Sequence, residues 1–174
     1  MVLIKQDEIL EIMQFLDKIM TNFESNEDLL KSFHETKFDE DFMNSYISEN
    51  FENIGKKVYR ESKKGHSKVD VLISLDDDLE YIIETKNYYS PSDLEFVYKQ
   101  IISRIHHRFL YASIVLLVNG YQKDKFKQIL EKINEWIELK NGIKKIKKMR
   151  IFLLFKYPTL ILVMILFLIL LVII

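Results

Sequence analysis

Two carboxylates and an amine in this sequence are spaced so that they could lie together on one face of a β-hairpin. Glu84 and Lys86 are two residues apart in a segment typical of a β-strand, so their side chains project from the same face. Asp70 precedes Glu84 by a gap of 13 residues. If the two strands form a hairpin whose paired residue numbers sum to 154, Asp70 stands opposite Glu84, with Cβ atoms about 5 Å apart. Carboxylates this close repel each other unless a cation or proton intervenes, so the pattern predicts a divalent metal site.

That prediction depends on the turn of the hairpin, which the acidic run 76–78 forms. A three-residue loop pairs Leu75 with Leu79 and gives the sum of 154. A two-residue loop gives 155 and moves Glu84 to the opposite face from Asp70. The plain alternative is that these charges merely decorate an exposed strand. Both faces of the hairpin are largely apolar, however, and charges among apolar side chains are costly unless paired or metal-bound.

The elements that must position these residues follow from hydrophobic periodicity. Apolar residues at helical spacing predict helices, and short runs rich in β-branched residues predict strands. Gly55 is expected to end a helix, because glycine tolerates positive φ. The segment 149–155 fits either a last strand or the lead-in to the apolar tail. The predicted helices cover 4–21, about 39–53, 92–109 and a segment from Phe126 to Ile137, and the predicted strands cover 56–61, 68–75, 79–87 and 111–118.

Composition excludes several classes of protein. The 174 residues include 22 aromatic side chains but only 4 Gly and 2 Pro, so the chain can bury a core and is not disordered along its length. With no cysteine, disulfides, thiol nucleophiles, zinc ribbons and iron–sulfur clusters are excluded. Residues 1–54 carry 13 acidic and 4 basic side chains, whereas 55–140 carry 15 basic and 13 acidic ones. The net charge of −1 therefore hides an acidic N-terminal region.

The C-terminal tail has the composition of a membrane span. Residues 157–174 would reach about 27 Å as a helix, every residue from Leu160 onward is apolar, and Pro158 suits a first helical turn. Five basic residues at 144–150 precede the tail. By the positive-inside rule we expect a single-pass membrane protein whose N-terminal domain faces the cytoplasm. The N-terminus has Asp7 and Glu8 where a signal peptide needs an apolar run.

With these residues in place, the chain resembles the PD-(D/E)XK nuclease superfamily. Asp70, the 13-residue gap and Glu84-Thr85-Lys86 match its signature, and the stretch GKKVYRESKKG at 55–65 resembles the first strand and loop of archaeal Holliday-junction resolvases and Mrr-like restriction endonucleases. The similarity covers about residues 40–120. It implies an α/β fold with a restriction-endonuclease-like αβββαβ core, to which this chain adds extra N-terminal helices and the C-terminal transmembrane helix. The expected domains are a helical extension at 1–38, a nuclease-like domain at 39–148 and the span at 157–174.

The resemblance implies a role for each residue of the signature. Asp70 and Glu84, with the Thr85 carbonyl, would be ligands of Mg²⁺, or of Mn²⁺ in its place. Asp70, Glu84 and Lys86 would be the catalytic residues, with Lys86 orienting or activating the attacking water. The expected activity is hydrolysis of DNA phosphodiester bonds by a membrane-anchored endonuclease.

Many members of the superfamily also have an acidic residue on the helix before the first strand. Glu49 and Glu52 are candidates, although the resolvase spacing before the glycine falls on Asn44. Glu61 is a further candidate, from the end of the first strand. Gln100 lies on the helix after the signature, where Mrr-like and RecB-like members often place a glutamine.

Basic residues beside the signature are candidates for contacts with DNA phosphates. Arg104 and Arg108 share a helical face with Gln100, and Lys64 and Lys68 flank a turn before Asp70. Such a face is equally often an ordinary solvated surface. Relatives of this fold that cut two strands are often dimers, and the resemblance therefore leaves a homodimer open.

Three classes of function remain open on sequence. The first is the membrane-anchored, metal-dependent nuclease. The second is a catalytically inactive descendant of the nuclease fold that binds DNA or serves as an adaptor. The third is a membrane-tethered protein-interaction domain, which the acidic residues of 1–54 suggest, because their charge disfavours DNA on that side.

Overall fold

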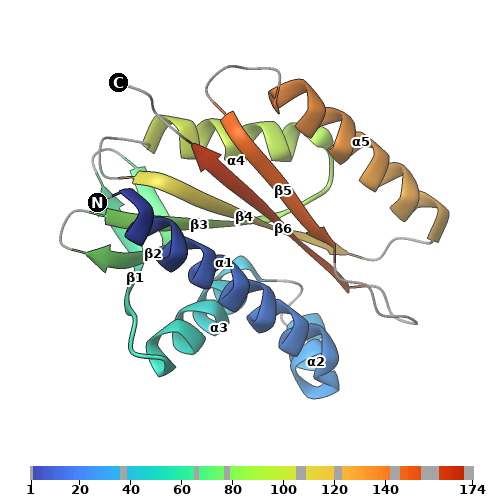
Figure 1. The fold of residues 1–174 in the computed structure, drawn as a ribbon. Coiled ribbons are helices and arrows are strands. Elements are labelled where there is room, and N and C mark those ends of the chain that lie inside the picture. The colour runs from blue at the N-terminus through green and yellow to red at the C-terminus, as the bar shows by residue number, and fades with distance from the viewer. Residues whose placement is uncertain are drawn as a thin grey trace.

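The computed structural model describes residues 2–35, 39–64, 67–76, 79–104, 109–119, 123–141, 146–153 and 161–170. It is a mixed α/β fold, in which helices lie on both sides of a β-sheet (Figure 1). In chain order the helices and strands are α1 Val2–Ser25, α2 Glu27–Glu35, α3 Glu40–Asn53, β1 Lys57–Lys64, β2 Ser67–Asp76, β3 Leu79–Asn87, α4 Pro91–Arg104, β4 Phe109–Asn119, α5 Lys123–Asn141, β5 Ile146–Leu153 and β6 Ile161–Leu170.

Strands β1 to β4 form a four-stranded mixed sheet. β1 pairs antiparallel with β2 and β2 antiparallel with β3, whereas β3 and β4 are parallel. Parallel neighbours need a crossover connection, and α4 supplies it. The sheet continues beyond β4 through β6 to β5, so that its order is β1-β2-β3-β4-β6-β5.

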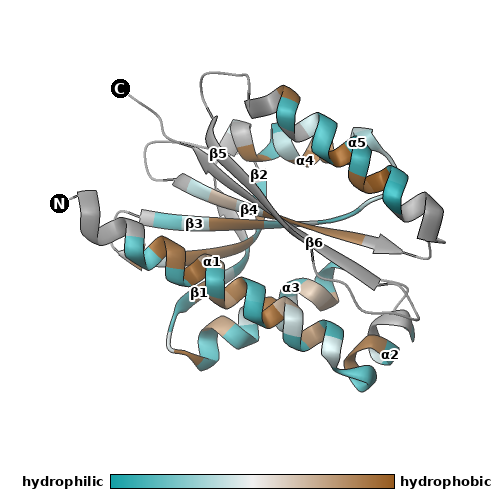
Figure 2. Ribbon diagram, turned by 45° about the vertical axis from the view of Figure 1, so that its right-hand side comes forward, coloured by the Kyte–Doolittle hydropathy of each residue, from teal (hydrophilic) through white to brown (hydrophobic). Residues whose placement is uncertain are grey.

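The two faces of the sheet are covered by different helices. α1, α2 and α3 lie on one side and α4 and α5 on the other (Figure 1). On the first side, buried residues of α1 and α3 pack against alternate residues of the strands: Val71, Ile73, Tyr81, Ile83, Val115 and Leu117. Hydrophobic residues occupy the middle of β3 and β4, between the two helical layers (Figure 2). Because strand side chains alternate between faces, the Glu84 side chain lies on the opposite face of β3 from Tyr81 and Ile83.

Most of the predicted elements are present. The order α3-β1-β2-β3-α4-β4 is the predicted one, and Gly55 ends α3 at φ +79° while Lys56 N–H donates to the Phe51 carbonyl. The segment that sequence left open is strand β5, as far as Leu153. The helix α2 was not predicted. It begins after Asn26, whose side chain accepts hydrogen bonds from the backbone of Asp28 and Leu29, which is an N-cap arrangement.

The apolar tail differs from its prediction. The sequence predicts a helix over 157–174, whereas Ile161–Leu170 forms strand β6, paired antiparallel with both β4 and β5. Residues 157–160 and 171–174 lie outside the described residues. A short apolar run fits a strand in the interior of a sheet as well as it fits a helix, because neither has a polar face. Among the helices of the described ranges, none has the length and hydrophobicity to cross a bilayer.

Candidate functional site

The β2–β3 hairpin has the predicted register over its paired residues, but Asp70 and Glu84 are not themselves among the backbone pairs. Its paired residue numbers sum to 154 from Val71↔Ile83 to Ser74↔Glu80. The turn itself was predicted wrongly, since Asp76 rather than Leu75 pairs with Leu79. A β-bulge between Ser74 and Asp76 absorbs the extra residue. The bulge thus restores the predicted register of 154 even though the loop between Asp76 and Leu79 has only two residues.

The two strands separate just beyond the pair Val71↔Ile83. There a side chain of β2, and not its backbone, accepts the next hydrogen bond from β3. Just after β3, Tyr88 N–H donates to the Leu117 carbonyl of β4. Because N–H groups alternate in direction along a strand, the N–H of Thr85, three residues earlier, points the opposite way, toward β2. There the Asp70 carboxylate accepts it, with 3.0 Å between Oδ2 and N. This hydrogen bond holds the half-buried Asp70 carboxylate against the Glu84–Lys86 segment.

Glu84 is the most buried charged residue of the predicted site. Its side chain is only 2% exposed, and so is that of Thr85. A carboxylate at this depth is stable only with hydrogen bonds or a cation to offset its desolvation. The two residues face opposite sides of β3, because strand side chains alternate. Glu84 thus shares a face with Lys86, while the Thr85 side chain lies on the α1–α3 side.

Lys86 makes an ion pair that the sequence did not suggest. Its Nζ lies 3.0 Å from Oε1 and 3.3 Å from Oε2 of Glu40, the first residue of α3. The same Glu40 carboxylate accepts the Asn87 N–H at 2.8 Å. Both side chains are about 30% exposed, at 31% and 29%, so the pair is partly shielded from water. Glu40 therefore fixes both the ammonium of Lys86 and the end of β3.

The position of Glu40 follows from the start of α3. Asp39 caps that helix by accepting the Asp41 N–H at 2.9 Å, and Glu40 follows directly. Asn44 lies one helical turn further on, 4% exposed, and its Oδ1 has no hydrogen-bond partner among the described residues. The resolvase spacing pointed to Asn44. Residues four apart share a helical face, so searching one turn earlier would have found the carboxylate.

Of the acidic residues predicted as accessory ligands, two lie on α3 and one lies on β1. Glu49 and Glu52 are exposed on α3. Glu61 lies across from Asp70, between the pairs Arg60↔Val71 and Ser62↔Val69, in a backbone conformation with φ +49°. It forms an exposed salt bridge with Lys68, and a hydrogen bond from Lys68 lowers the pKa of the Glu61 carboxyl. That bridge engages Lys68, which was predicted to contact DNA.

Of the remaining predicted residues, the structure describes only Gln100 in full. Gln100 is half-buried on α4, and its carbonyl accepts a hydrogen bond from Ser103. Lys64 ends β1 and Arg104 ends α4, but the side chains of both, and the whole of Arg108, lie outside what the structure describes. Within the described ranges, no three acidic or histidine side chains gather closely enough to hold a metal ion. The signature itself contains two carboxylates, those of Asp70 and Glu84, and the backbone carbonyl of Thr85.

No family model, curated protein or solved structure matches the chain. The function has to be argued from the site itself.

Proposed function

We propose that the chain is a metal-dependent endonuclease that hydrolyses DNA phosphodiester bonds with Asp70, Glu84 and Lys86. The observation that carries the proposal is the hydrogen bond from Thr85 N–H to Asp70, which keeps one carboxylate beside the strand segment that bears the other. The order α3-β1-β2-β3-α4-β4 is also that of the restriction-endonuclease-like core that the signature resembles.

The donor atoms suit a hard divalent cation. Carboxylate and carbonyl oxygens are the ligands that Mg²⁺ and Mn²⁺ prefer, and the chain offers them from Asp70, Glu84 and the Thr85 backbone. Glu84 is buried to 2% exposure, so a cation beside it would offset the cost of burying its charge. Such a cation polarises the scissile phosphate and makes hydroxide available near neutral pH.

Lys86 supplies the positive charge of the site. It extends from the same face of β3 as Glu84, and Glu40 restrains its ammonium by two short contacts. We assign Glu40 as a positioning residue, because a restrained ammonium can hold a water or a phosphate oxygen in one place. The Asp70 carboxylate is likewise held in one place by its hydrogen bond from Thr85 N–H.

The proposal is tested by DNA cleavage with the full chain, Mg²⁺ and plasmid or oligonucleotide substrates. We expect chelator-sensitive cleavage that Lys86→Ala abolishes, while Lys99→Ala, which removes an exposed lysine of α4, leaves it intact. Cleavage that survives both Lys86→Ala and excess chelator would contradict the assignment, as would a wild-type chain that cleaves no DNA with any divalent metal.

A second candidate is the non-catalytic descendant of the same fold. The ion pair between Lys86 and Glu40 favours it, because an ammonium occupied by a carboxylate is less available to a phosphate. This candidate predicts metal-independent DNA binding that Asp70→Asn and Glu84→Gln leave unchanged. It also predicts no cleavage.

Attachment to a membrane is a separate proposal. It rests on the apolar composition of 157–174 and on the five basic residues of 144–150, and it requires that Ile161–Leu170 leave its pairing with β4 and β5. Alkaline extraction of membranes from cells that express the full chain is the test. Retention in the membrane pellet supports attachment, and release into the supernatant contradicts it.

A further inference from the structure

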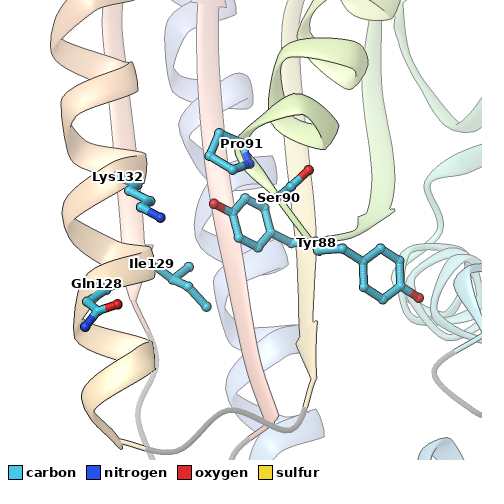
Figure 3. Close-up of a pocket in the computed structure, with 7 residues that line it drawn as sticks. Tyr88, Ser90, Pro91, Gln128, Ile129 and Lys132 are labelled. Atoms are coloured by element: carbon cyan, nitrogen blue, oxygen red, sulfur yellow. The ribbon is translucent and has the colours of Figure 1, made fainter.

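An open hollow lies just past the end of β3, the strand that carries Glu84 and Lys86. It has a volume of about 290 Å³ and lies between the loop that enters α4 and one side of α5 (Figure 3). Its first residue, Tyr88, directly follows the end of β3 at Asn87. This is the carboxyl end of the parallel strands β3 and β4, where α/β folds commonly bind ligands. The lining residues are Tyr88, Tyr89, Ser90, Pro91, Gln128, Ile129 and Lys132.

The lining combines a flat apolar part with polar groups. Tyr88 is buried at 2% exposure, whereas Tyr89 is 73% exposed, more than any other large hydrophobic residue described. Across the hollow, Gln128 and Lys132 are exposed one helical turn apart on α5. Exposed aromatic rings stack on nucleobases of any sequence. Lysine is a common partner of a phosphate, and an amide side chain can hydrogen-bond a base edge.

The loop wall of the hollow is held in place before any ligand arrives. Asp93 Oδ2 accepts hydrogen bonds from Tyr89 N–H at 3.0 Å, from Ser90 N–H at 2.8 Å and from the Ser90 hydroxyl at 3.2 Å. Tyr88 N–H is bonded to the Leu117 carbonyl at 2.9 Å. A site formed in advance loses less entropy when it binds.

Charge decides where a phosphate would lie. The Asp93 carboxylate repels an anion at the loop wall, although three donors on one of its oxygens offset part of its charge. Lys132, on the α5 wall, is exposed and takes part in none of the ion pairs among the described residues. An anionic group is therefore favoured on the α5 side, and an uncharged ring on the tyrosine side.

We propose that this hollow binds one nucleotide of the DNA strand that the candidate site cleaves, with the base against Tyr89 and the phosphate at Lys132. The inference rests on the proposed function for the identity of the ligand. The hollow is at the lower limit of small-molecule pockets, about 300 Å³, which suits a single nucleotide better than a larger ligand. Stacking without base-specific contacts makes the subsite tolerant of sequence.

The test is binding of thymidine 5′-monophosphate to the full chain, measured by ligand-observed NMR without divalent metal. We expect saturable binding that is tighter than that of thymidine or of inorganic phosphate alone. Tyr89→Ala should weaken it on the order of tenfold. Lys132→Ala should remove the advantage of the nucleotide over thymidine. The matched controls are Phe96→Ala, an exposed aromatic of α4, and Lys127→Ala, an exposed lysine of α5 outside the lining.

Binding that is absent, or that Tyr89→Ala leaves unchanged, overturns the inference. Failure of the nuclease proposal is seen separately, because cleavage is measured in another assay. Lys86→Ala should abolish cleavage and leave the affinity for thymidine 5′-monophosphate intact.

Discussion

The two ends of the β2–β3 hairpin differ in how the backbone N–H groups of β3 find hydrogen-bond acceptors. Near the turn, backbone pairs run from Ser74↔Glu80 to Val71↔Ile83, and the last three of them have buried, mainly apolar side chains on both faces. At the other end the strands part, and side-chain carboxylates accept hydrogen bonds from the backbone of β3. Asp70 accepts the N–H of Thr85, and Glu40 accepts the N–H of Asn87.

The difference shows how a polar site can exist at the edge of an apolar sheet. A buried backbone N–H without an acceptor is costly, so the opening of the hairpin requires acceptors there. Carboxylates meet that requirement and at the same time bring negative charge to one place. Asp70 and Glu40 thus have a structural role in addition to any catalytic one, and variants must separate the two.

The largest expected effect on stability is at the end of the hairpin near its turn, where β2 and β3 are paired. Ile73→Ala removes a fully buried side chain of the α1–α3 core and should lower the free energy of unfolding by about 2–5 kcal/mol. Urea denaturation measures it, with Lys57→Ala on the exposed edge of β1 as the control. An effect of Ile73→Ala no larger than that of the control would mean that this end does not stabilise the hairpin.

At the open end, the two substitutions of Asp70 should differ. Asp70→Ala leaves Thr85 N–H without its acceptor and should cost about 1–3 kcal/mol. Asp70→Asn retains a side-chain oxygen at that position and should cost less, while it removes the charge. Denaturation of both variants gives the comparison. Equal losses of stability would show that the hydrogen bond to Thr85 is not what holds the opened strands.

The Glu40 contact should matter less for stability. Glu40→Ala removes both the acceptor of Asn87 N–H and the partner of Lys86, at a cost of about 1 kcal/mol. Glu40→Gln keeps the acceptor and removes the ion pair, so it should fall between wild type and the alanine variant. A larger loss in Glu40→Gln than in Glu40→Ala would contradict this division of roles.

The smallest effect is expected at the side chain of Thr85. Its hydroxyl is buried and has no hydrogen-bond partner among the described residues, so Thr85→Val should change the unfolding free energy by less than about 1 kcal/mol, and toward stability. DNA cleavage should persist, because only the backbone carbonyl of Thr85 is proposed as a ligand. A loss of cleavage in a stable Thr85→Val variant would assign a role to the hydroxyl instead.

Local patterns determined what could be predicted from the sequence. The alternation of apolar residues on β2 and β3 gave the correct register at Val71↔Ile83, although the bulge beside Leu75 was not foreseen. Glu40 was missed because the resolvase spacing falls on Asn44, one helical turn after it, and the pairing of Glu40 with Lys86 joins residues 46 positions apart. The apolar tail was predicted as a helix because strands and helices without a polar face look alike in sequence, and pairing with β4 and β5 is a tertiary property.

Binding of Mn²⁺ to the full chain is the most direct test of the central claim, that Asp70 and Glu84 lie together as ligands of a hard cation. Isothermal titration calorimetry compares the wild-type chain with Asp70→Asn, whose fold is checked by urea denaturation. We predict saturable binding by the wild type and a loss of at least about tenfold in the variant, in line with the removal of one charged ligand. Equal Mn²⁺ affinity in the two proteins, or no binding by a folded wild-type chain, would contradict the claim.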